Sequence, residues 1–261
     1  MHFKEDHMRN GQLKPGFNVQ IAVESEYIIS IQQFPNPADV KTLIPFLEHL
    51  KEKLNMTYSN IVADAGYESE QNYTYLEANN QRAFIKPTSY ETSKTKAYKQ
   101  NIGKLENMVY NSKEDTYTCA NGKILSVVGT HTKRNRNTKF ESVVTTYKCE
   151  SCEKCPLREK CTKSKDGKQL QVSKEFLRQR KQSLENIKSE EGICLRMNRS
   201  IQAEGTFGVI KADHHFRQFL TRGNKQVLTE LLLLALSFNI RKFHRKIQDE
   251  RTETHLFKKA S

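Results

Sequence analysis

The chain has 261 residues, enough for one substantial core or for one core with an insertion. The formal net charge is +13, and residues 133–181 contribute +9 of it, with 15 Lys/Arg against 6 Asp/Glu. This balance favours a polyanionic partner such as nucleic acid over a solvated basic surface without function. The longest apolar run, residues 227–240, is too short to cross a bilayer, and six Cys, four of them clustered, do not match a disulfide framework. We therefore expect a cytoplasmic protein without membrane contact.

Apolar patterns predict an α/β fold with the order β-β-α-β-α-β in the first third of the chain. The expected strands are residues 17–23, 27–33, 60–63 and 82–85, with a hairpin turn at 24–26. The first expected helix is capped by Asn36 and has Pro37 in its first position. Pro45 should kink this helix or delay its regular start. A second helix is expected at residues 69–78.

Beyond Pro87 the pattern fails, because residues 88–180 are polar, rich in Lys and hold five of the six Cys. We interpret this segment as an insertion that is not part of the sheet. Helices are expected again from Glu175, at residues 196–211, and at 225–247 as a buried core helix. The predicted organisation is a first part of the catalytic core at 1–87, a basic Cys-rich insertion at 88–180, and a helical C-terminal part of the core at 181–261.

Asp64 is the first candidate for catalysis. It follows the apolar strand 60–63 and precedes the small residues Ala65 and Gly66, which leave its face open. Open α/β sheets place their chemistry at the carboxyl ends of strands, which favours a catalytic carboxylate. A turn Asp that bonds the next backbone amides fits the spacing equally well.

Glu204 is the second candidate. It precedes Lys211 by seven residues, almost two helical turns, so both side chains should lie on one helix face. Gly205 and Gly208 cost about 1 kcal/mol each relative to Ala in a helix, which suggests that a strand or DNA approaches closely. The alternative is an exposed Glu on an amphipathic helix.

Three blocks of the sequence resemble insertion-sequence DDE transposases. They are Lys14-Pro15-Gly16-Phe17-Asn18-Val19-Gln20, Asp64-Ala65-Gly66-Tyr67-x-Ser69, and Arg199 to Lys211 followed by Phe216-Arg217-x-Phe219-x-x-Arg222-Gly223. The similarity extends over residues 4–242 and is closest to the branch with a Cys-rich insertion before the last catalytic helix. The motifs are specific jointly, although each is weak alone.

The resemblance implies a ribonuclease-H-like fold, a mixed sheet with flanking helices, in which three acidic residues bind two Mg²⁺. Asp64 matches the second Asp of the family, Glu204 its Glu, and Lys211 the Lys that follows the Glu after six residues. Two metals activate the attacking oxygen and stabilise the leaving 3′ oxygen in phosphoryl transfer on DNA ends. Lys211 would hold a phosphate at the cleavage site.

Arg199 approximates the Arg that the family places upstream of its Glu. The signature of related transposases has Tyr, two residues, Arg, three residues and then Glu. Here Met197 and Ser200 occupy those two slots, and Arg199 stands one position early. In that role Arg199 would bind a phosphate through two hydrogen bonds.

The first catalytic Asp of the family belongs on a strand upstream of the segment 14–16. Asp6 lies there, in a polar segment without a strand pattern. We therefore expect an N-terminally truncated transposase that cannot assemble the metal pair alone. The alternatives are a catalytically inactive DNA-binding remnant, which forms a homo-oligomer or joins an intact transposase, and a zinc-ribbon module unrelated to transposition. The block from Arg199 to Gly223 argues against the last, because a zinc ribbon needs no such helix.

Five cysteines form a group in the insertion. Cys149, Cys152, Cys155 and Cys161 have the spacing Cys-x₂-Cys-x₂-Cys-x₅-Cys, and Cys119 precedes them. Clustered Cys in a reducing compartment are usually metal ligands, so four of the five are expected to hold a structural Zn²⁺. An iron–sulfur cluster and simple reduced thiols are the alternatives. Cys194 stands apart and is expected to be a core thiol.

A basic surface continues past the predicted catalytic helix. We expect four of its residues to contact DNA phosphate: His214, Arg217, Arg222 and Lys225. For His214 and the adjacent His215, metal ligation or plain exposure is the alternative. The expected partner of the chain is therefore DNA.

Overall fold

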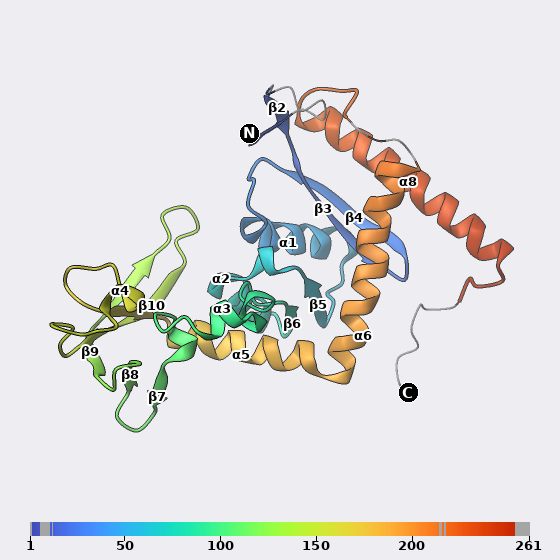
Figure 1. Cartoon of the computed structure of the whole chain (residues 1–261). Helices are drawn as coiled ribbons and strands as arrows, with labels where there is room; N and C mark the ends of the chain where they lie inside the picture. Colours follow the sequence, from blue (N-terminus) through green and yellow to red (C-terminus); the bar gives the residue numbers. More distant parts are fainter. Residues whose placement is uncertain (1, 6–10, 12, 214–215, 217, 254–261) are drawn as a thin grey trace. The chain divides into compact units, whose positions relative to one another are not determined.

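The computed structural model describes residues 2–5, 11, 13–213, 216 and 218–253 (Figure 1). The chain folds into two compact units. Unit 1 comprises Met1–Glu68, Tyr75–Lys86 and Ser183–Ser261, and unit 2 comprises Ser69–Thr74 and Pro87–Gln182. Helices α2 (Glu70–Ala78) and α5 (Lys174–Lys188) each begin in unit 2 and end in unit 1.

Unit 1 is a mixed α/β structure. Its other elements are β1 (His2–Glu5), β2 (Leu13–Gly16), β3 (Asn18–Glu24), β4 (Tyr27–Phe34), α1 (Leu43–Leu54), β5 (Asn60–Ala63), β6 (Arg82–Ile85), α6 (Glu190–Arg199), α7 (Gly205–Ala212) and α8 (Asn224–Gln248). Strands β1 and β2 pair antiparallel, as do β3 and β4, whereas β5 and β6 pair parallel. A parallel pair needs a crossover between its strands, and α2 lies in that connection.

The hairpin β3–β4 confirms two predicted strands and the turn between them. Its two turn residues, Ser25 and Glu26, both have positive φ angles, 51° and 73°. Two-residue turns of this kind match the right-handed twist of the paired strands. Ile28 and Ile31 of β4 are buried, and partly buried apolar residues of β3 pack against the same cluster.

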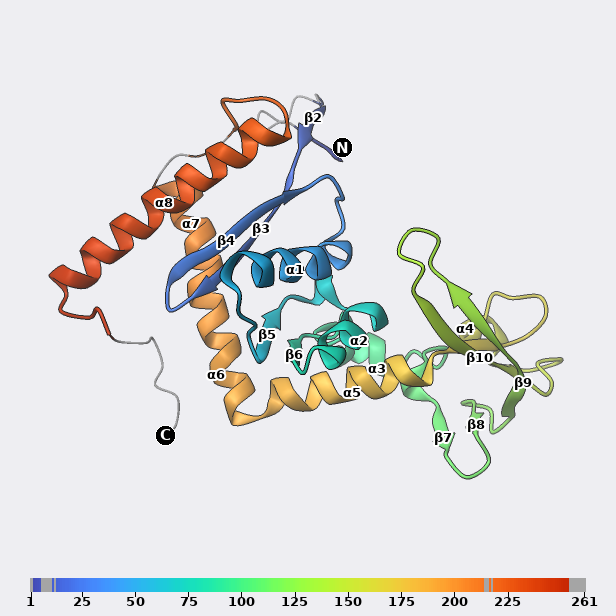
Figure 2. The ribbon, with the colours of Figure 1, turned by 180° about the vertical axis from the view of Figure 1, so that it is seen from behind.

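Helix α8 runs along this hairpin in both views of the chain (Figures 1 and 2). Its buried residues recur at helical spacing and join the cluster of Ile28 and Ile31: Val227, Leu231, Ala235 and Phe238. The amide of Asn239 bonds both backbone groups of Ile28, at 2.9 Å to the N–H and 2.8 Å to the carbonyl. Asn239 therefore satisfies the edge of β4 as a neighbouring strand would.

The prediction that α8 is a buried core helix holds for one of its faces only. Leu232, Leu236, Ile240 and Phe243 are more than half exposed. One face of the helix covers β4, and the other carries apolar residues at the surface. In the described part of the chain, no helix combines the length and the apolar character that crossing a bilayer requires.

Helix α1 begins later than the sequence suggested. Its regular turns start at Leu43, after a 3₁₀ turn at Asp39–Lys41, and Asn36 is not its cap. The backbone carbonyl of Asn36 instead accepts a hydrogen bond from Asn18. Pro45 falls in the first turn, where a missing N–H costs nothing, so the proline delays the helix rather than kinking it.

Unit 2 contains a five-stranded antiparallel sheet that the sequence did not reveal. Its elements are α3 (Lys96–Lys99), β7 (Val109–Asn111), β8 (Thr116–Thr118), β9 (Ile124–Arg134), β10 (Glu141–Cys149), α4 (Arg158–Cys161) and β11 (Gln169–Val172). The strand order is β11-β10-β9-β8-β7. Its core gathers Met108, Tyr117, Leu125, Tyr147, Cys149, Leu170 and Val172. The apolar pattern was missed because β9 buries only Leu125 and is otherwise exposed on both faces.

A buried ion pair joins the turn of the β3–β4 hairpin to the end of α8. The ammonium of Lys246, whose side chain is 2% exposed, lies 2.9 Å from Glu26 and donates to the carbonyl of Ser25 at 3.0 Å. Burial by itself raises the pKa of Glu26, but the hydrogen bond from Lys246 and the charges of Lys242 and Lys246 together hold it below its ordinary value. The pair therefore stabilises the folded state only while Glu26 is ionised.

We expect the substitution Glu26→Gln to lower the free energy of unfolding by about 3 kcal/mol at pH 7, because it leaves the buried Lys246 without a counter-charge. The loss should be full above the ordinary Glu pKa of about 4.3 and should shrink as the pH falls through the lower pKa of the folded state. Urea unfolding at pH 7 and at pH 4 measures both. The exposed Glu185→Gln serves as the control, and equal unfolding of the two variants would contradict the prediction.

Candidate functional site

Asp64 lies where the sequence placed it, directly after β5. Its backbone is extended, with φ −74° and ψ 167°, and the chain then makes a 3₁₀ turn at Ala65–Tyr67. The side chain of Asp64 does not cap this turn and is 58% exposed. Asp64 therefore does not act as a turn Asp that bonds the next backbone amides, and its carboxylate is available for other contacts.

One guanidinium joins the two candidate carboxylates. Arg199 Nη2 lies 2.6 Å from Asp64 Oδ2, and Arg199 Nη1 lies 3.4 Å from Glu204 Oε1. Asp64 and Glu204 come from segments far apart in the sequence, yet both converge on this cation. Ser200 Oγ also donates to Glu204 Oε2 at 3.1 Å, which leaves the Glu204 side chain held from two directions.

The backbone around Glu204 explains this contact. The predicted helix at 196–211 begins earlier, at Glu190, and it changes from α6 to a π-helical turn at Ser200–Glu204 before continuing as α7. A π-helix bonds residues five apart, so such residues stand one above the other. Arg199 precedes Glu204 by five residues, and the π-helical turn therefore brings their side chains to the same side.

A polar network behind Asp64 was not predicted. Asp39 Oδ1 accepts hydrogen bonds from Asn18 Nδ2 at 2.8 Å and from Gln20 Nε2 at 3.1 Å. Tyr67 Oη donates to Gln20 Oε1. Burial, and next the charge of Asp39, raise the pKa of Tyr67, so its hydroxyl stays protonated and remains a donor.

The loop that carries Asp64 packs against this network. A Cβ at Gly66 would lie 3.1 Å from Asp39 Oδ2, so the loop approaches Asp39 as closely as the backbone permits. The sequence signal for the network was available: Asn18 and Gln20 are alternate residues of one strand and therefore share a face.

The other predicted phosphate-binding residues are not gathered around the carboxylates in the described part of the chain. Lys211 lies on α7 with its ammonium 5.6 Å from the ring centre of Phe207, and it forms no ion pair with Asp64 or Glu204 there. Arg222 and Lys225 are exposed. His214, His215 and Arg217 fall outside the described residues, as does Asp6.

Gly205 and Gly208 do not mark a close approach within the described residues. A Cβ at either position would meet nothing within 4 Å. The expectation that a strand lies against them is therefore wrong. The space beside the helix at these two positions is open. Close approach by DNA, the other explanation expected for the two glycines, remains a proposal.

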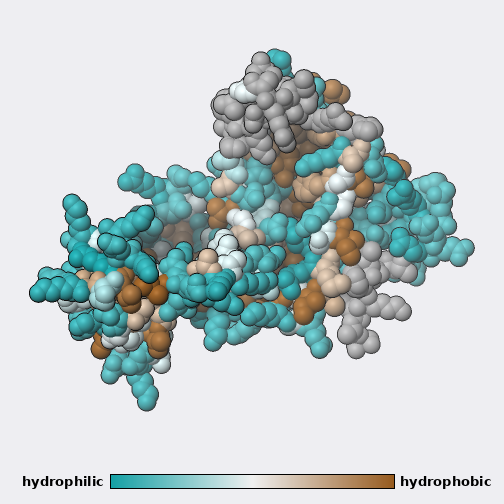
Figure 3. All heavy atoms as spheres, in the orientation of Figure 1, coloured by the Kyte–Doolittle hydropathy of each residue, from teal (hydrophilic) through white to brown (hydrophobic). Residues whose placement is uncertain are grey.

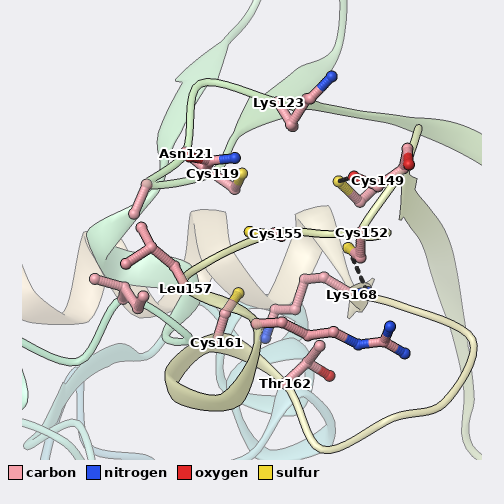
Figure 4. Close-up of a pocket in the computed structure, with 14 residues that line it drawn as sticks. Cys119, Asn121, Lys123, Cys149, Cys152, Cys155, Leu157, Cys161, Thr162 and Lys168 are labelled. Carbon is pink, nitrogen blue, oxygen red and sulfur yellow. Dashed lines mark hydrogen bonds between the residues drawn. The ribbon is translucent and has the colours of Figure 1, made fainter.

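Five cysteines line a single pocket of unit 2 (Figure 4). They come from the loop after β8, the end of β10, the following loop and α4: Cys119, Cys149, Cys152, Cys155 and Cys161. The backbone N–H of Lys168 donates to Cys152 Sγ at 3.3 Å, and a Cβ at Gly167 would lie 3.2 Å from the same sulfur. The positive φ of Gly167, +87°, also favours glycine there.

The thiols of this pocket are close enough to influence one another. Burial, and then a hydrogen bond with Cys152, raise the pKa of Cys149 to about 12. Burial also raises the pKa of Cys161, while the charge of Lys168 acts in the opposite direction. Cys194, predicted to be a core thiol, is exposed, which is a correction. It lies on α6.

Among the described residues, no three His, Cys, Asp or Glu side chains are placed to hold a metal ion. The carboxylate site brings together two acidic residues, Asp64 and Glu204, around one cation. Their oxygens suit a hard divalent ion, whereas the pocket sulfurs suit a softer one.

Residues 118–244, just under half of the chain, match the family described as "Transposase DDE domain". The match confirms the resemblance to insertion-sequence DDE transposases. It includes the five pocket cysteines, Arg199, Glu204 and Lys211, but it does not reach Asp64. No curated protein and no solved structure matches the chain.

We expect Asp39→Ala to lower the free energy of unfolding by about 2 kcal/mol, because Asn18 and Gln20 lose a charged acceptor. Asp39→Asn is the matched variant. It keeps one acceptor oxygen at the same place and should cost less than half as much. Urea unfolding of the three proteins measures the difference. If Asp39→Ala were as stable as the parent, the network would have no part in holding the loop of Asp64.

Proposed function

We propose that this chain, whose residues 118–244 belong to the transposase DDE domain family, supplies Asp64 and Glu204 to the metal-binding site of a DNA transposase. The match supports a DNA transposase at the level of the family. That Asp64 and Glu204 are the metal-binding carboxylates, and that they act in phosphoryl transfer, is proposed in addition to what the match supports. Asp64 lies outside the matched range, so its part in the proposal rests on geometry.

The observation that carries the proposal is the shared contact of both carboxylates with Arg199. Two acidic side chains from distant segments would repel each other at such a place unless a cation joined them. The carboxylate oxygens are the donors that Mg²⁺ prefers. When bound, a metal pair activates the attacking oxygen and stabilises the leaving 3′ oxygen of the DNA strand. Asp64 and Glu204 would hold the metal, and Lys211 would bind a phosphate.

A ribonuclease-H-like sheet is the corresponding proposal for the fold. In the described part of unit 1, β3 pairs only with β4, and β5 pairs only with β6. Each pair therefore has an edge open to a further strand. The side chains of Tyr67, after β5, and Gln20, on β3, bond each other, which supports a common sheet completed by one more strand. The family's first Asp would belong on such a strand.

DNA is the proposed substrate and binding partner. The basic stretch 133–181 begins at the tip of the β9–β10 hairpin, which carries exposed Lys133, Arg134, Arg136 and Lys139. Hydrophilic residues dominate the face of this region in Figure 3. Such a surface contacts phosphate without reading sequence. Arg222 and Lys225 are exposed in unit 1 and suit the same role.

The test is nicking of supercoiled DNA in Mg²⁺ or Mn²⁺. We expect Asp64→Asn and Glu204→Gln each to lower the nicking rate by roughly 100-fold or more, the scale for losing a group that stabilises transition-state charge. Both variants should bind DNA with the parent's salt dependence, because the phosphate contacts lie elsewhere. Glu185→Gln, an exposed change of the same kind, is the control. Equal nicking by all four proteins would contradict the assignment.

A second function is favoured by one observation, namely that only two carboxylates converge in the described residues. In this alternative, the chain binds DNA, as a homo-oligomer or together with an intact transposase, but does not cut it. Salt-dependent DNA binding without metal-dependent nicking by the parent protein would support this alternative. Absence of DNA binding as well would contradict both functions.

A structural Zn²⁺ in the cysteine pocket is a separate proposal. Its support is the convergence of five thiols on one pocket, next to a small core that a metal would reinforce (Figure 4). Since no three of these thiols are placed to ligate in the described residues, binding has to draw the sulfurs together. It also has to release the proton that the raised pKa of Cys149 retains.

We expect the purified protein to contain one zinc per chain by elemental analysis. Cys152→Ser should lose the metal and lower the melting temperature, because tetrahedral coordination needs four ligands. Cys194→Ser removes an exposed thiol outside the pocket and should change neither quantity. A brown protein that contains iron would instead indicate an iron–sulfur cluster. A colourless protein without zinc would contradict metal binding.

A further inference from the structure

We propose that Arg199 is an exchangeable internal counter-ion, which neutralises Asp64 and Glu204 in the metal-free protein and is displaced when a divalent cation binds. This inference rests on the proposed function, because it assumes that the same two carboxylates bind the metal. In this role, Arg199 would hold the two carboxylates in position and neutralise their charge until the metal binds.

The exposure of the three side chains gives the direction of the exchange. Arg199 is 23% exposed, whereas Asp64 and Glu204 are 58% and 64% exposed. The guanidinium is therefore the more enclosed partner, and the two carboxylate side chains are largely open to solvent. A cation from solution can approach the same pair without first unfolding the helix that carries Arg199.

Electrostatics makes the two cations competitors. One guanidinium charge stands between two carboxylate charges, at 2.6 Å from one and 3.4 Å from the other. A divalent ion at the same oxygens would repel a guanidinium at such distances. Binding of one cation to the carboxylates therefore weakens binding of the other. By linkage, the coupling free energy is the same in both directions.

The π-helical turn supplies the means of release. It ends at Glu204 and gives way to α7, so the contact between Arg199 and Glu204 depends on a local departure from α-helical geometry. Glu204 keeps its hydrogen bond from Ser200 when Arg199 leaves. The freed guanidinium has five donors in a planar arrangement that suits a phosphate. Metal loading would thus pass Arg199 from the carboxylates to the DNA backbone.

The test is a calorimetric titration of the full chain with Mn²⁺ alone, without DNA. Removing the competing charge in Arg199→Ala should tighten Mn²⁺ binding by at least about fivefold. The same variant should melt at a lower temperature than the parent in EDTA, and the gap should close when Mn²⁺ is added. Arg245→Ala removes an exposed positive charge elsewhere on unit 1 and should leave both quantities unchanged.

Two further variants keep the test decisive. Arg199→Lys retains the charge and should bind Mn²⁺ more weakly than Arg199→Ala. If Arg199→Ala does not fold, Arg199→Gln serves as the neutral variant, and its Mn²⁺ binding is compared with that of Arg199→Lys. Weaker or unchanged Mn²⁺ binding by the neutral variants would overturn the inference, because Arg199 would then assist the metal or only brace the helix.

Failure of the proposed function gives a different result. If Asp64→Asn and Glu204→Gln bind Mn²⁺ as the parent does, these carboxylates are not the metal ligands, and both proposals fall. If they lose binding while Arg199→Ala binds like the parent, the metal site stands and only the exchange is wrong.

Discussion

Two carboxylates that face one another need a cation, and this constraint organises the candidate site. Asp64 stands at the end of a short parallel strand, and Glu204 stands on a helix from the far end of the chain. Arg199 binds both and so connects the strand end to the helix. In a chain with a net charge of +13, the acidic pair is a local exception to the surrounding charge. In the function that we propose, this pair would bind a divalent cation and the basic surfaces would bind DNA.

Each unit relies on a different kind of stabilisation. Unit 1 buries the apolar cluster between β4 and α8 and adds the ion pair of Lys246 with Glu26. Unit 2 has a smaller core, in which Cys149 is itself a buried member. The tip of the hairpin β9–β10, residues 133–139, lies outside that core and contributes positive charge rather than buried area. The thiol pocket lies beside this core, where a metal would offset the scarcity of apolar residues.

Sequence patterns predicted the elements of unit 1 well where one face is apolar. The strand at residues 60–63 and the turn of the β3–β4 hairpin were confirmed, because alternation and positive-φ turn positions are local properties. Tertiary effects explain the errors. Asn36 does not cap α1 because its carbonyl is bonded by Asn18. The sheet of unit 2 was missed because β9 is exposed on both faces and its apolar residues do not alternate with polar ones. Helix α8 was interpreted as a buried core helix because its apolar residues extend all round.

The candidate site shows the limit of counting residues in a motif. Arg199 stands one position earlier than the family's spacing places its Arg, and a regular α-helix would turn it away from Glu204. The π-helical turn at Ser200–Glu204 accommodates one additional residue, so an Arg five positions before the Glu reaches the place that an Arg four positions before it would hold in an α-helix. No local pattern in the sequence predicts this turn, and the contact of Arg199 with Asp64 joins residues 135 positions apart. In the site that we propose, the contact between Arg199 and Glu204 would therefore take the place of the one that the family's spacing implies.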